Sequence, residues 1–204
     1  MSPDTSSAAP LQLGQQLRDF KFSTYNPVTK RFEDHTLFQF LLEGKWVVLY
    51  FYPSDFTFVC PTELSDLAHY QEQLKEIGVE VISMSTDTKF SHLAWHNAEK
   101  LLKDVRFLMG SDPTGEIASL FGVYDATIGA TFRGTFIINP KAMLVGSEVN
   151  YYNVGRSASE LYRKMRAYTY LHERPEQACP AAWEEGQTVL TPSEKLVGRV
   201  SDFV

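Results

Sequence analysis

Two cysteines are the residues of this chain with the widest choice of chemistry. The 204-residue sequence contains only Cys60 and Cys179, which lie 119 positions apart. This spacing excludes a local Cys-x-x-Cys redox pair and a cysteine-based zinc ribbon, since both need two thiols within one turn. Structural disulfides are rare in the cytosol. In a cytosolic chain the two residues would therefore serve in catalysis, in metal binding or as buried, inert side chains.

Cys60 lies at a position that favours catalysis. The run Trp46–Tyr52 is uninterrupted, β-branched and aromatic, as in a strand buried on both faces of a parallel sheet, and Pro53 ends it. A helix is predicted to begin near Pro61. Open α/β sheets bind ligands at this carboxyl edge, and a helix N-terminus stabilises an anion through its free N–H groups and its dipole. We therefore expect Cys60 to be a reactive thiolate.

Three neighbours support a nucleophile at Cys60. Thr57 precedes it by three positions, a spacing that can bring the hydroxyl close to the sulfur, and Pro53 can shield the site from water. Arg133 is the best candidate to hold a substrate and stabilise charge on a leaving oxygen, and Arg156 is the second. Each has a plainer interpretation: a backbone cap for Thr57, a strand end for Pro53 and a solvent-facing strand residue for Arg133.

Alternating strands and helices are predicted around this site. The helix from Pro61 carries apolar residues at helical spacing and stops at Gly78. The later elements are a strand (79–85), a helix capped by 86–88 that carries Phe90, Leu93 and Leu101, a hairpin (131–138 and 143–149, joined by 139–142) and a helix (157–172) with Leu161, Met165 and Tyr168 on one face. This order predicts an α/β, thioredoxin-like fold with an N-terminal extension and a C-terminal arm.

Composition limits the organisation, the partners and the location. We expect a disordered lead (1–12), a thioredoxin-like domain (13–172) and an arm (173–204) in which Pro, Gly, Glu, Ser and Thr are frequent. No apolar run approaches the roughly 18–20 residues of a membrane helix, and the N-terminal ten residues lack the basic and apolar regions of a signal peptide. A cytoplasmic protein is therefore expected. The net charge of −6 argues against nucleic acid or anionic membrane as partner and favours a small substrate.

A metal site is the first alternative. His92 and His96 are four positions apart on a predicted helix, the spacing used by zinc hydrolases. No glutamate directly follows His92, and the other three histidines are scattered along the sequence. We therefore expect no metal ligands in this chain.

The sequence around Cys60 resembles one family closely. The segment Pro53-Ser-Asp-Phe-Thr57-Phe-Val-Cys60-Pro-Thr-Glu63 carries the Pro-x-x-x-Thr-x-x-Cys signature of peroxiredoxins and is similar to their typical two-cysteine branch. The C-terminal part, with Trp183-Glu-Glu-Gly and Thr191-Pro-Ser, looks like the bacterial alkyl hydroperoxide reductase C type. The similarity spans almost the whole chain and continues through residues 83–88, 92–96, 111–113, 132–138, 154–157 and 178–183.

This resemblance implies a role for each candidate residue and a reaction. The resemblance assigns the family's four active-site roles to Pro53, Thr57, Cys60 and Arg133. It also implies that Glu63 and Arg156 form the polar network around them and that Cys179 is the resolving thiol. The implied reaction reduces hydrogen peroxide and small organic hydroperoxides, leaves a sulfenic acid on Cys60 and then joins it to Cys179 in a disulfide. No cofactor is expected.

Partners are implied in the same way. Family members are homodimers whose disulfide joins two subunits, and they often form decamers of five dimers. The chain has no Cys-x-x-Cys of its own, so an external dithiol must reduce the disulfide: thioredoxin or a flavoprotein disulfide reductase.

Two departures and two alternatives remain. The Gly-Gly-Leu-Gly insertion of eukaryotic members is absent before Phe107, and the chain ends Val200-Ser-Asp-Phe-Val204 without a Tyr-Phe tail. Both absences imply an enzyme that resists overoxidation. A non-enzymatic alternative is an oligomeric, redox-regulated chaperone or scaffold. A general disulfide oxidoreductase is disfavoured, because Cys60 is alone at its helix start.

Overall fold

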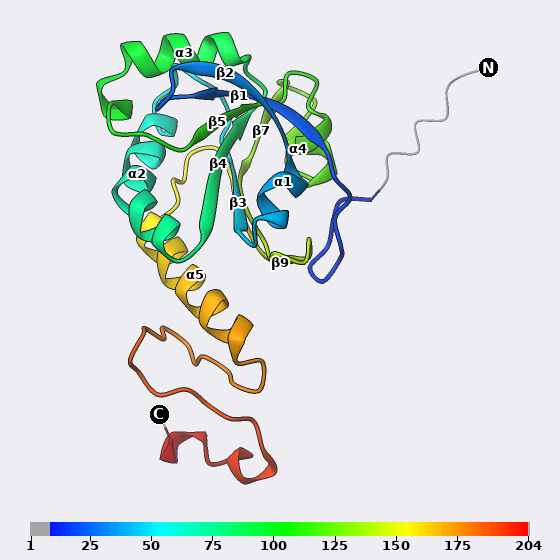
Figure 1. Ribbon diagram of the computed structural model, residues 1–204, viewed down its shortest axis with the longest axis vertical. Helices are drawn as coiled ribbons and strands as arrows, with labels where there is room; N and C mark the ends of the chain where they lie inside the picture. The colour runs from blue at the N-terminus through cyan, green and yellow to red at the C-terminus, as the bar shows by residue number, and fades with distance from the viewer. Residues whose placement is uncertain (1–8, 204) are drawn as a thin grey trace, which may run out of the picture. The chain divides into compact units, whose positions relative to one another are not determined.

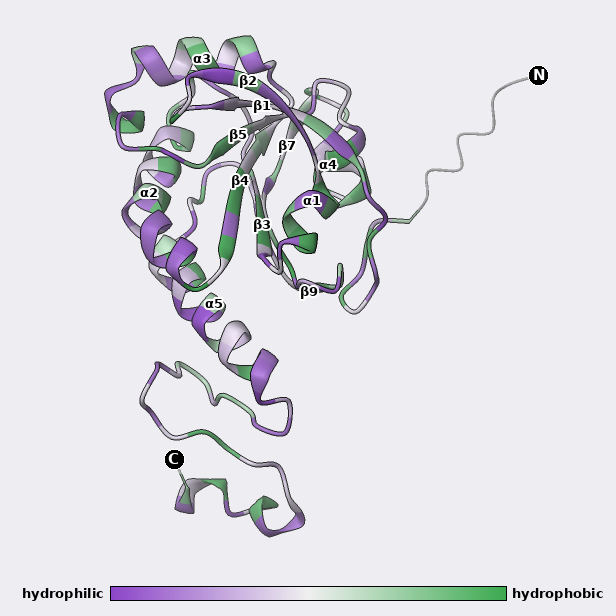
Figure 2. Ribbon diagram, viewed as in Figure 1, coloured by the Kyte–Doolittle hydropathy of each residue, from purple (hydrophilic) through white to green (hydrophobic). Residues whose placement is uncertain are grey.

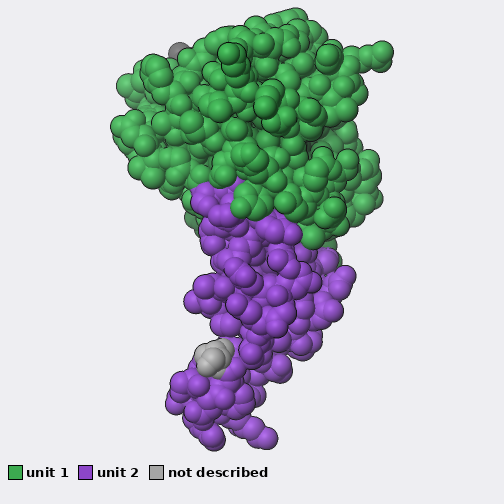
Figure 3. Space-filling view, turned by 90° about the vertical axis from the view of Figure 1, so that its left-hand side faces the viewer, with its two compact units in different colours: residues 1–156 green, residues 157–204 purple. Residues whose placement is uncertain are grey.

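The computed structural model describes residues 9–203, which divide into two compact units at the step from Arg156 to Ser157 (Figure 3). Residues 1–8 of the expected lead lie outside the described residues. Among the described residues, the Leu11 amide donates to the Leu120 carbonyl at 3.0 Å, so hydrogen bonds to the first unit begin before residue 13. The boundary expected between residues 172 and 173 stays a prediction.

A seven-stranded mixed sheet forms the centre of the first unit. Its strand order is β2-β1-β5-β4-β3-β8-β9, in which β3, β4 and β5 are parallel and the outer pairs are antiparallel. The strands are β1 (Lys21–Asn26), β2 (Arg31–Thr36), β3 (Trp46–Phe51), β4 (Val79–Ser85), β5 (Leu108–Ser111), β8 (Arg133–Ile138) and β9 (Leu144–Asn150); β6 (Tyr124–Asp125) and β7 (Ala130–Thr131) pair separately.

Strand β3 has the interior position that its composition predicts. All six of its residues are buried, and it pairs in parallel with β4 and antiparallel with β8. A strand covered on both faces favours apolar side chains, which explains its uninterrupted aliphatic and aromatic sequence, although the buried Tyr50 hydroxyl has no hydrogen-bond partner among the described residues. The predicted central strand, the βαβ unit and the thioredoxin-like sheet are confirmed.

Helices cover both faces of this sheet (Figure 1). α2 (Cys60–Glu76) and α3 (Lys89–Ala98) lie on one face, and α1 (Leu37–Leu42) and α4 (Glu116–Leu120) lie on the other. As predicted, α2 begins next to Pro61, which lies in its first turn, and ends before Gly78. Gly78 has a φ of 77°, a left-handed conformation that favours glycine. Across the described residues, every helix is too short or too polar to cross a membrane.

The main core lies between the sheet and the pair α1 and α4. Its aromatic centre is formed by Phe51, Phe121 and Phe136, whose ring centroids are 4.7–5.8 Å apart. Figure 2 shows the inner strands coloured mainly as hydrophobic and the outward face of α2 as hydrophilic. Burial of these rings gives the sheet a rigid platform for the residues at its carboxyl edge.

One predicted helix differs from the expectation. α3 ends at Ala98, and Leu101 lies in the short 3-10 turn η1 (Lys100–Leu102). Phe90 and Leu101 are exposed, whereas the residues that α3 buries are His92 and Trp95. The apolar periodicity identified the wrong face, because the buried histidine is polar and its partners are remote in the sequence.

The predicted hairpin is confirmed and supplies a functional strand. β8 and β9 pair antiparallel, and the Asn139 side chain accepts hydrogen bonds from the amides of Lys141 and Met143 in the turn between them. Arg133 is the first residue of β8 and directly opposes Asn150. Its place in an inner strand puts it beneath other elements and away from solvent.

The second unit consists of α5 (Ala158–Glu173) and the arm that follows it. Ser157 caps α5 by accepting from the Glu160 amide, and the helix buries Leu161 and Met165. The arm has little regular structure beyond the turns η2 (Glu194–Leu196) and η3 (Val200–Asp202) and one bridge between Ala178 and Leu190. The predicted final helix is thus confirmed.

Replacement of Phe136 by alanine should lower the free energy of unfolding by about 3–5 kcal/mol, because it removes the ring at the middle of the aromatic core and leaves a cavity. Urea unfolding followed by far-ultraviolet circular dichroism measures the change. Leu42→Ala is the matched control, since Leu42 is 86% exposed and its loss should change stability by less than about 0.5 kcal/mol. Equal effects would contradict the assignment of the core.

Candidate active site

Cys60 is the first residue of α2 and is fully buried. The residue before it, Val59, provides no side-chain cap, and Pro61 occupies the first turn. The sulfur therefore lies at the positive end of a seventeen-residue helix, where an anion is stabilised. This is the position at the carboxyl edge of β3 that the sequence predicts.

Arg133 provides a cation at the sulfur. Its Nη1 donates to the Cys60 Sγ at 3.5 Å and to the Glu63 Oε2 at 2.6 Å, while its Nε donates to the Tyr152 carbonyl at 2.8 Å. Three acceptors around one guanidinium fix its orientation. The solvent-facing interpretation of Arg133 is wrong: the residue is 3% exposed.

Arg156 contacts the same carboxylate from the other side. Its Nε and backbone N donate to the Glu63 Oε1 at 2.9 and 2.8 Å, and its Nη2 donates to Oε2 at 3.2 Å. Nη1 donates to the Thr135 hydroxyl at 3.1 Å, and the guanidinium lies 3.4 Å from the ring centroid of Tyr50. Arg156 therefore holds Glu63 in place and supports the site from behind.

The three charged groups set one another's protonation states. Burial alone would raise the pKa of Glu63, but hydrogen bonds and charge from Arg156, together with the charge of Arg133, outweigh it and lower the pKa. Burial would lower the pKa of Arg133, but Glu63 and the Cys60 sulfur raise it. One carboxylate between two guanidiniums leaves one positive charge uncompensated. The Cys60 sulfur is the further acceptor that Arg133 contacts beside this carboxylate, so a negative charge on the sulfur would lie directly against a guanidinium.

The loop between β3 and α2 carries Pro53 and Thr57. Pro53 is buried and Thr57 is half-buried. The Thr57 hydroxyl donates to the Ser54 carbonyl at 2.8 Å, which leaves its oxygen lone pairs free to accept a hydrogen bond from an O–H group. Between the two, Phe56 has a φ of 55°, a strained conformation for a bulky residue. The loop must therefore be held by contacts elsewhere.

Asp55 and His92 supply that anchor. The Asp55 carboxylate contacts the His92 Nδ1 at 2.9 Å and accepts from the Tyr52 hydroxyl at 2.8 Å, while its amide donates to Asp87 at 2.8 Å. The His92 Nε2 faces the Gly110 carbonyl at 2.9 Å. His92 is completely buried, and both of its ring nitrogens are within hydrogen-bond distance of protein atoms. This geometry opposes the alternative of a metal bound by His92 and His96.

Sequence reasoning missed Tyr50, Asp55 and His92 as parts of the site. In the sequence, Tyr50 is one of several aromatic residues in a buried strand. Nothing in that pattern indicates that its ring packs against the guanidinium of Arg156. Asp55 had a signal: it is the one acidic residue in the apolar run from Pro53 to Cys60. A charged group in such a setting needs a buried partner.

Cys179 lies in the second unit and is half-buried. Burial raises the pKa of its thiol, and the positive charge of Arg163 opposes that rise. Both cysteines are free thiols in the structure. The first unit thus contains Pro53, Thr57, Cys60, Glu63, Arg133 and Arg156, while the predicted resolving thiol belongs to the other unit.

Comparisons with known proteins agree with the geometry. The model of the AhpC/TSA family matches residues 13–146. Alkyl hydroperoxide reductase C of Salmonella typhimurium is 44% identical over 158 residues, which is 78% of this chain and 84% of that protein. The Staphylococcus aureus protein of the same name is 41% identical over 188 residues, 92% of this chain and 98% of its own.

Solved structures of similar proteins extend the comparison to the fold. The reduced 2-Cys peroxiredoxin of Plasmodium vivax has a TM-score of 0.86 and 31% identity, and the match covers 94% of this chain and 100% of that chain. AhpC of Enterococcus faecalis has a TM-score of 0.77 and 36% identity over 82% of this chain and 98% of its own.

Glu63→Gln should destabilise the protein by about 3–5 kcal/mol, because it leaves two buried guanidiniums without a counter-charge. The folded-state pKa of Glu63 is lowered, so its stabilising contribution is complete above the unfolded value of about 4.3 and is lost as pH falls through the lowered pKa. Urea unfolding at a series of pH values should show the gap between wild type and variant closing only below about pH 4.3.

Glu43→Gln is the control for that prediction. Glu43 pairs with Lys45 at 2.9 Å on the surface, and an exposed pair contributes at most about 1 kcal/mol. A Glu63 effect as small as that of Glu43, or a gap that closes already at neutral pH, would contradict the electrostatic account of the site.

Proposed function

The chain belongs to the AhpC/TSA family and is a thiol-dependent peroxidase of the peroxiredoxin class; on that premise we propose that Cys60 is its peroxide-reactive thiol and Cys179 its resolving thiol. The observation that carries the proposal is the contact of Cys60 with Arg133 in a buried cluster that lacks one negative charge. The relatives' names describe reductases and peroxiredoxins, which favours the peroxidase over the chaperone alternative.

The first step is attack of the Cys60 thiolate on one oxygen of a hydroperoxide. The O–O bond breaks, the sulfur becomes a sulfenic acid, and the leaving oxygen takes up a proton to give water or an alcohol. Arg133 reaches the sulfur and can therefore donate to both peroxide oxygens as charge moves from one to the other. Because the Arg133 guanidinium is already in position before the substrate binds, the site needs no reorganisation as charge develops.

Thr57 and Pro53 have supporting roles in this step. Because the Thr57 hydroxyl donates its hydrogen bond to the Ser54 carbonyl, its oxygen can accept a hydrogen bond from the peroxide O–H and orient the substrate toward the sulfur. Pro53 covers the site without adding an N–H that would compete for the thiolate. Glu63 and Arg156 keep Arg133 in place, and Tyr50 packs beneath Arg156.

The second step joins the two thiols. The Cys179 thiolate attacks the Cys60 sulfenic sulfur, and hydroxide leaves as water. A disulfide needs Cα atoms within roughly 7 Å, and Cys60 is fully buried, so the first turn of α2 must open. We place this disulfide between two subunits, by analogy with the family.

Assembly, reductant and location follow as parts of the same proposal. A homodimer is the minimal form, and five dimers form a decamer. An external dithiol, thioredoxin or a flavoprotein disulfide reductase, restores the thiols in the cytoplasm, since this chain has no second pair of cysteines. Without the Gly-Gly-Leu-Gly insertion before Phe107, we expect the sulfenic acid to be resolved before a second peroxide oxidises it.

Single cysteine variants test the two roles. In stopped-flow tryptophan fluorescence with hydrogen peroxide, Cys60→Ser should abolish the fast phase, while Cys179→Ser should keep it and stop at a sulfenic acid after one turnover. A dimedone label detected by mass spectrometry identifies that acid. If wild type and Cys60→Ser consume peroxide equally slowly, the assignment of Cys60 is wrong.

Arg133→Gln should slow the fast phase roughly 10²–10³-fold, as expected when a donor to a developing charge is lost. Alkylation of Cys60 by iodoacetamide serves as the comparison, since it needs the thiolate but transfers no charge to a peroxide oxygen. Its rate should fall less than the peroxide rate. Equal losses in the two reactions would limit Arg133 to thiolate stabilisation.

Mixing the two cysteine variants tests the subunit boundary. After peroxide treatment, a mixture of Cys60→Ser and Cys179→Ser chains should give a covalent dimer on a non-reducing gel, whereas neither variant alone should. If the oxidised wild type shows no covalent dimer on the same gel, the disulfide lies within one chain.

A further inference from the structure

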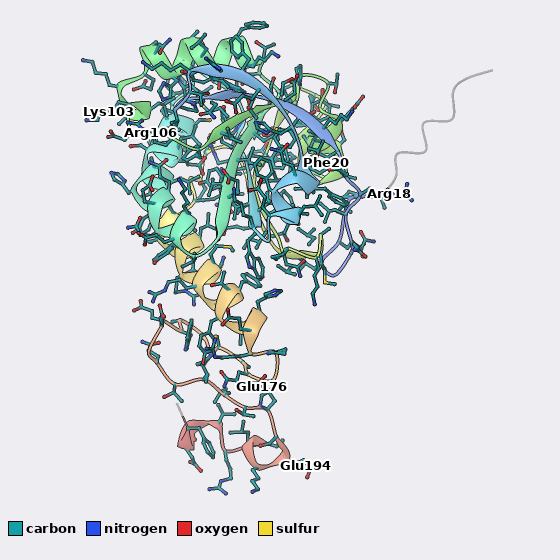
Figure 4. The ribbon with its side chains drawn as sticks, viewed as in Figure 1. Arg18, Phe20, Lys103, Arg106, Glu176 and Glu194 are labelled. Carbon is teal, nitrogen blue, oxygen red and sulfur yellow. The ribbon has the colours of Figure 1, made fainter. Side chains whose placement is uncertain are left out.

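Cys179 lies at the mouth of a closed loop in the second unit. Ala178 and Leu190 exchange two backbone hydrogen bonds of 2.8 and 2.9 Å, which tie the two ends of the loop together. In Figure 4 the segment begins just after Glu176 and ends before Glu194. Because Cys179 directly follows the bridge residue Ala178, its backbone is fixed at one end by that bridge.

Trp183 fixes the other end of the segment that holds Cys179. The residue is 1% exposed, and its amide donates to the Pro180 carbonyl at 3.2 Å, closing a turn that starts directly after Cys179. Its indole Nε1 donates to the Gln187 carbonyl, and its ring lies 5.1 Å from that of Tyr170 on α5. The position of this turn therefore determines the position of the thiol.

Arg163 connects α5 to that turn through a fixed geometry. Its Nε and Nη2 donate to the two Glu160 carboxylate oxygens at 2.7 and 2.9 Å, and its Nη1 donates to the Trp183 carbonyl at 3.0 Å. The bidentate pair orients the guanidinium, and the remaining nitrogen holds the turn. A lysine could not make these three bonds at once.

The charge of Arg163 also acts on the thiol. Burial raises the pKa of Cys179, and Arg163 is the group that lowers it. Within the second unit, the other charged groups that act on this guanidinium are Glu160, its hydrogen-bonded partner, and Glu184, in the loop itself. A thiol reacts with a sulfenic acid as the thiolate, so a cation held near Cys179 favours the reactive form.

We propose that Arg163 is a positioning residue for the resolving step: it holds the turn that follows Cys179 through the Trp183 carbonyl and keeps a positive charge close to the thiol. The inference rests on the proposed role of Cys179. In that step the Cys179 S–H loses its proton, the thiolate forms the S–S bond, the Cys60 S–O bond breaks, and the released hydroxide leaves as water.

The first test measures the thiol and needs no catalysis. In a Cys60→Ser chain, Cys179 is the remaining cysteine, so the pH dependence of thiol alkylation by iodoacetamide, followed by mass spectrometry, reports on it alone. Adding Arg163→Met should raise the titration midpoint, and adding Arg163→Lys, which keeps the charge, should leave it close to the parent value. A purely structural role for Arg163 would move both variants alike, because neither side chain can form the bidentate fork.

The second test follows the two oxidation phases by stopped-flow fluorescence. Arg163→Met should leave the peroxide-dependent phase unchanged, slow the first-order disulfide phase roughly tenfold, as for loss of a charge-assisted contact, and move the pH profile of that phase upward. Arg199→Met is the matched control: Arg199 lies in the same unit but outside the loop between Ala178 and Leu190, and its exposed side chain pairs with Asp202 at 3.0 Å, so neither phase should change. Near-ultraviolet circular dichroism checks that Trp183 stays packed in every variant.

The outcomes separate this inference from the proposed function. An unchanged or faster disulfide phase in Arg163→Met, an unmoved titration midpoint, or an equal effect of Arg199→Met would overturn the role of Arg163. A disulfide phase that persists in Cys179→Ser would instead overturn the proposed role of Cys179, whatever the arginine variants show.

Discussion

The structure of the site depends on one buried carboxylate between two guanidiniums. Glu63 accepts a hydrogen bond from Arg133 on one oxygen and from Arg156 on both, and all three side chains are buried. Desolvated charges are tolerated only when they are paired and hydrogen-bonded. The cluster is one negative charge short of neutral, and the sulfur of Cys60, in contact with Arg133, is where that charge can reside. Protein stability and the proposed activation of Cys60 thus depend on the same contacts.

The remaining parts of the first unit keep this cluster in register. β3 supplies Tyr50 beneath Arg156, α2 supplies Cys60 and Glu63 within one turn, and β8 supplies Arg133. The intervening loop is held by Asp55, whose carboxylate contacts His92 and Tyr52. Such contacts offset the strain of Phe56 and keep Thr57 available to a substrate.

The second thiol has a different environment, which suits the different role proposed for it. Cys60 contacts the buried guanidinium of Arg133, whereas Cys179 is half-buried in a loop where the charge that acts on it, Arg163, is shared with Glu160. In the proposed reaction the resolving thiol reacts only after a sulfenic acid has formed, so a weaker bias toward the thiolate suffices for it.

Local sequence determined much of this protein. The apolar run of β3, the helix start at Pro61, the hairpin turn and the cap at Ser157 depend on neighbouring residues. The Pro-x-x-x-Thr-x-x-Cys signature pointed, by resemblance, to Cys60 as the proposed nucleophile. Arg133 and Arg156 could be named through resemblance, yet spacing alone left Arg133 equally consistent with a solvent-facing residue. Only the tertiary structure decided its burial, because its partners Cys60 and Glu63 lie 73 and 70 positions away. The same holds for His92, which is buried because Asp55 and Gly110 reach it from other elements. Periodicity records which residues share a face; which polar groups are paired inside depends on contacts that only the folded chain creates.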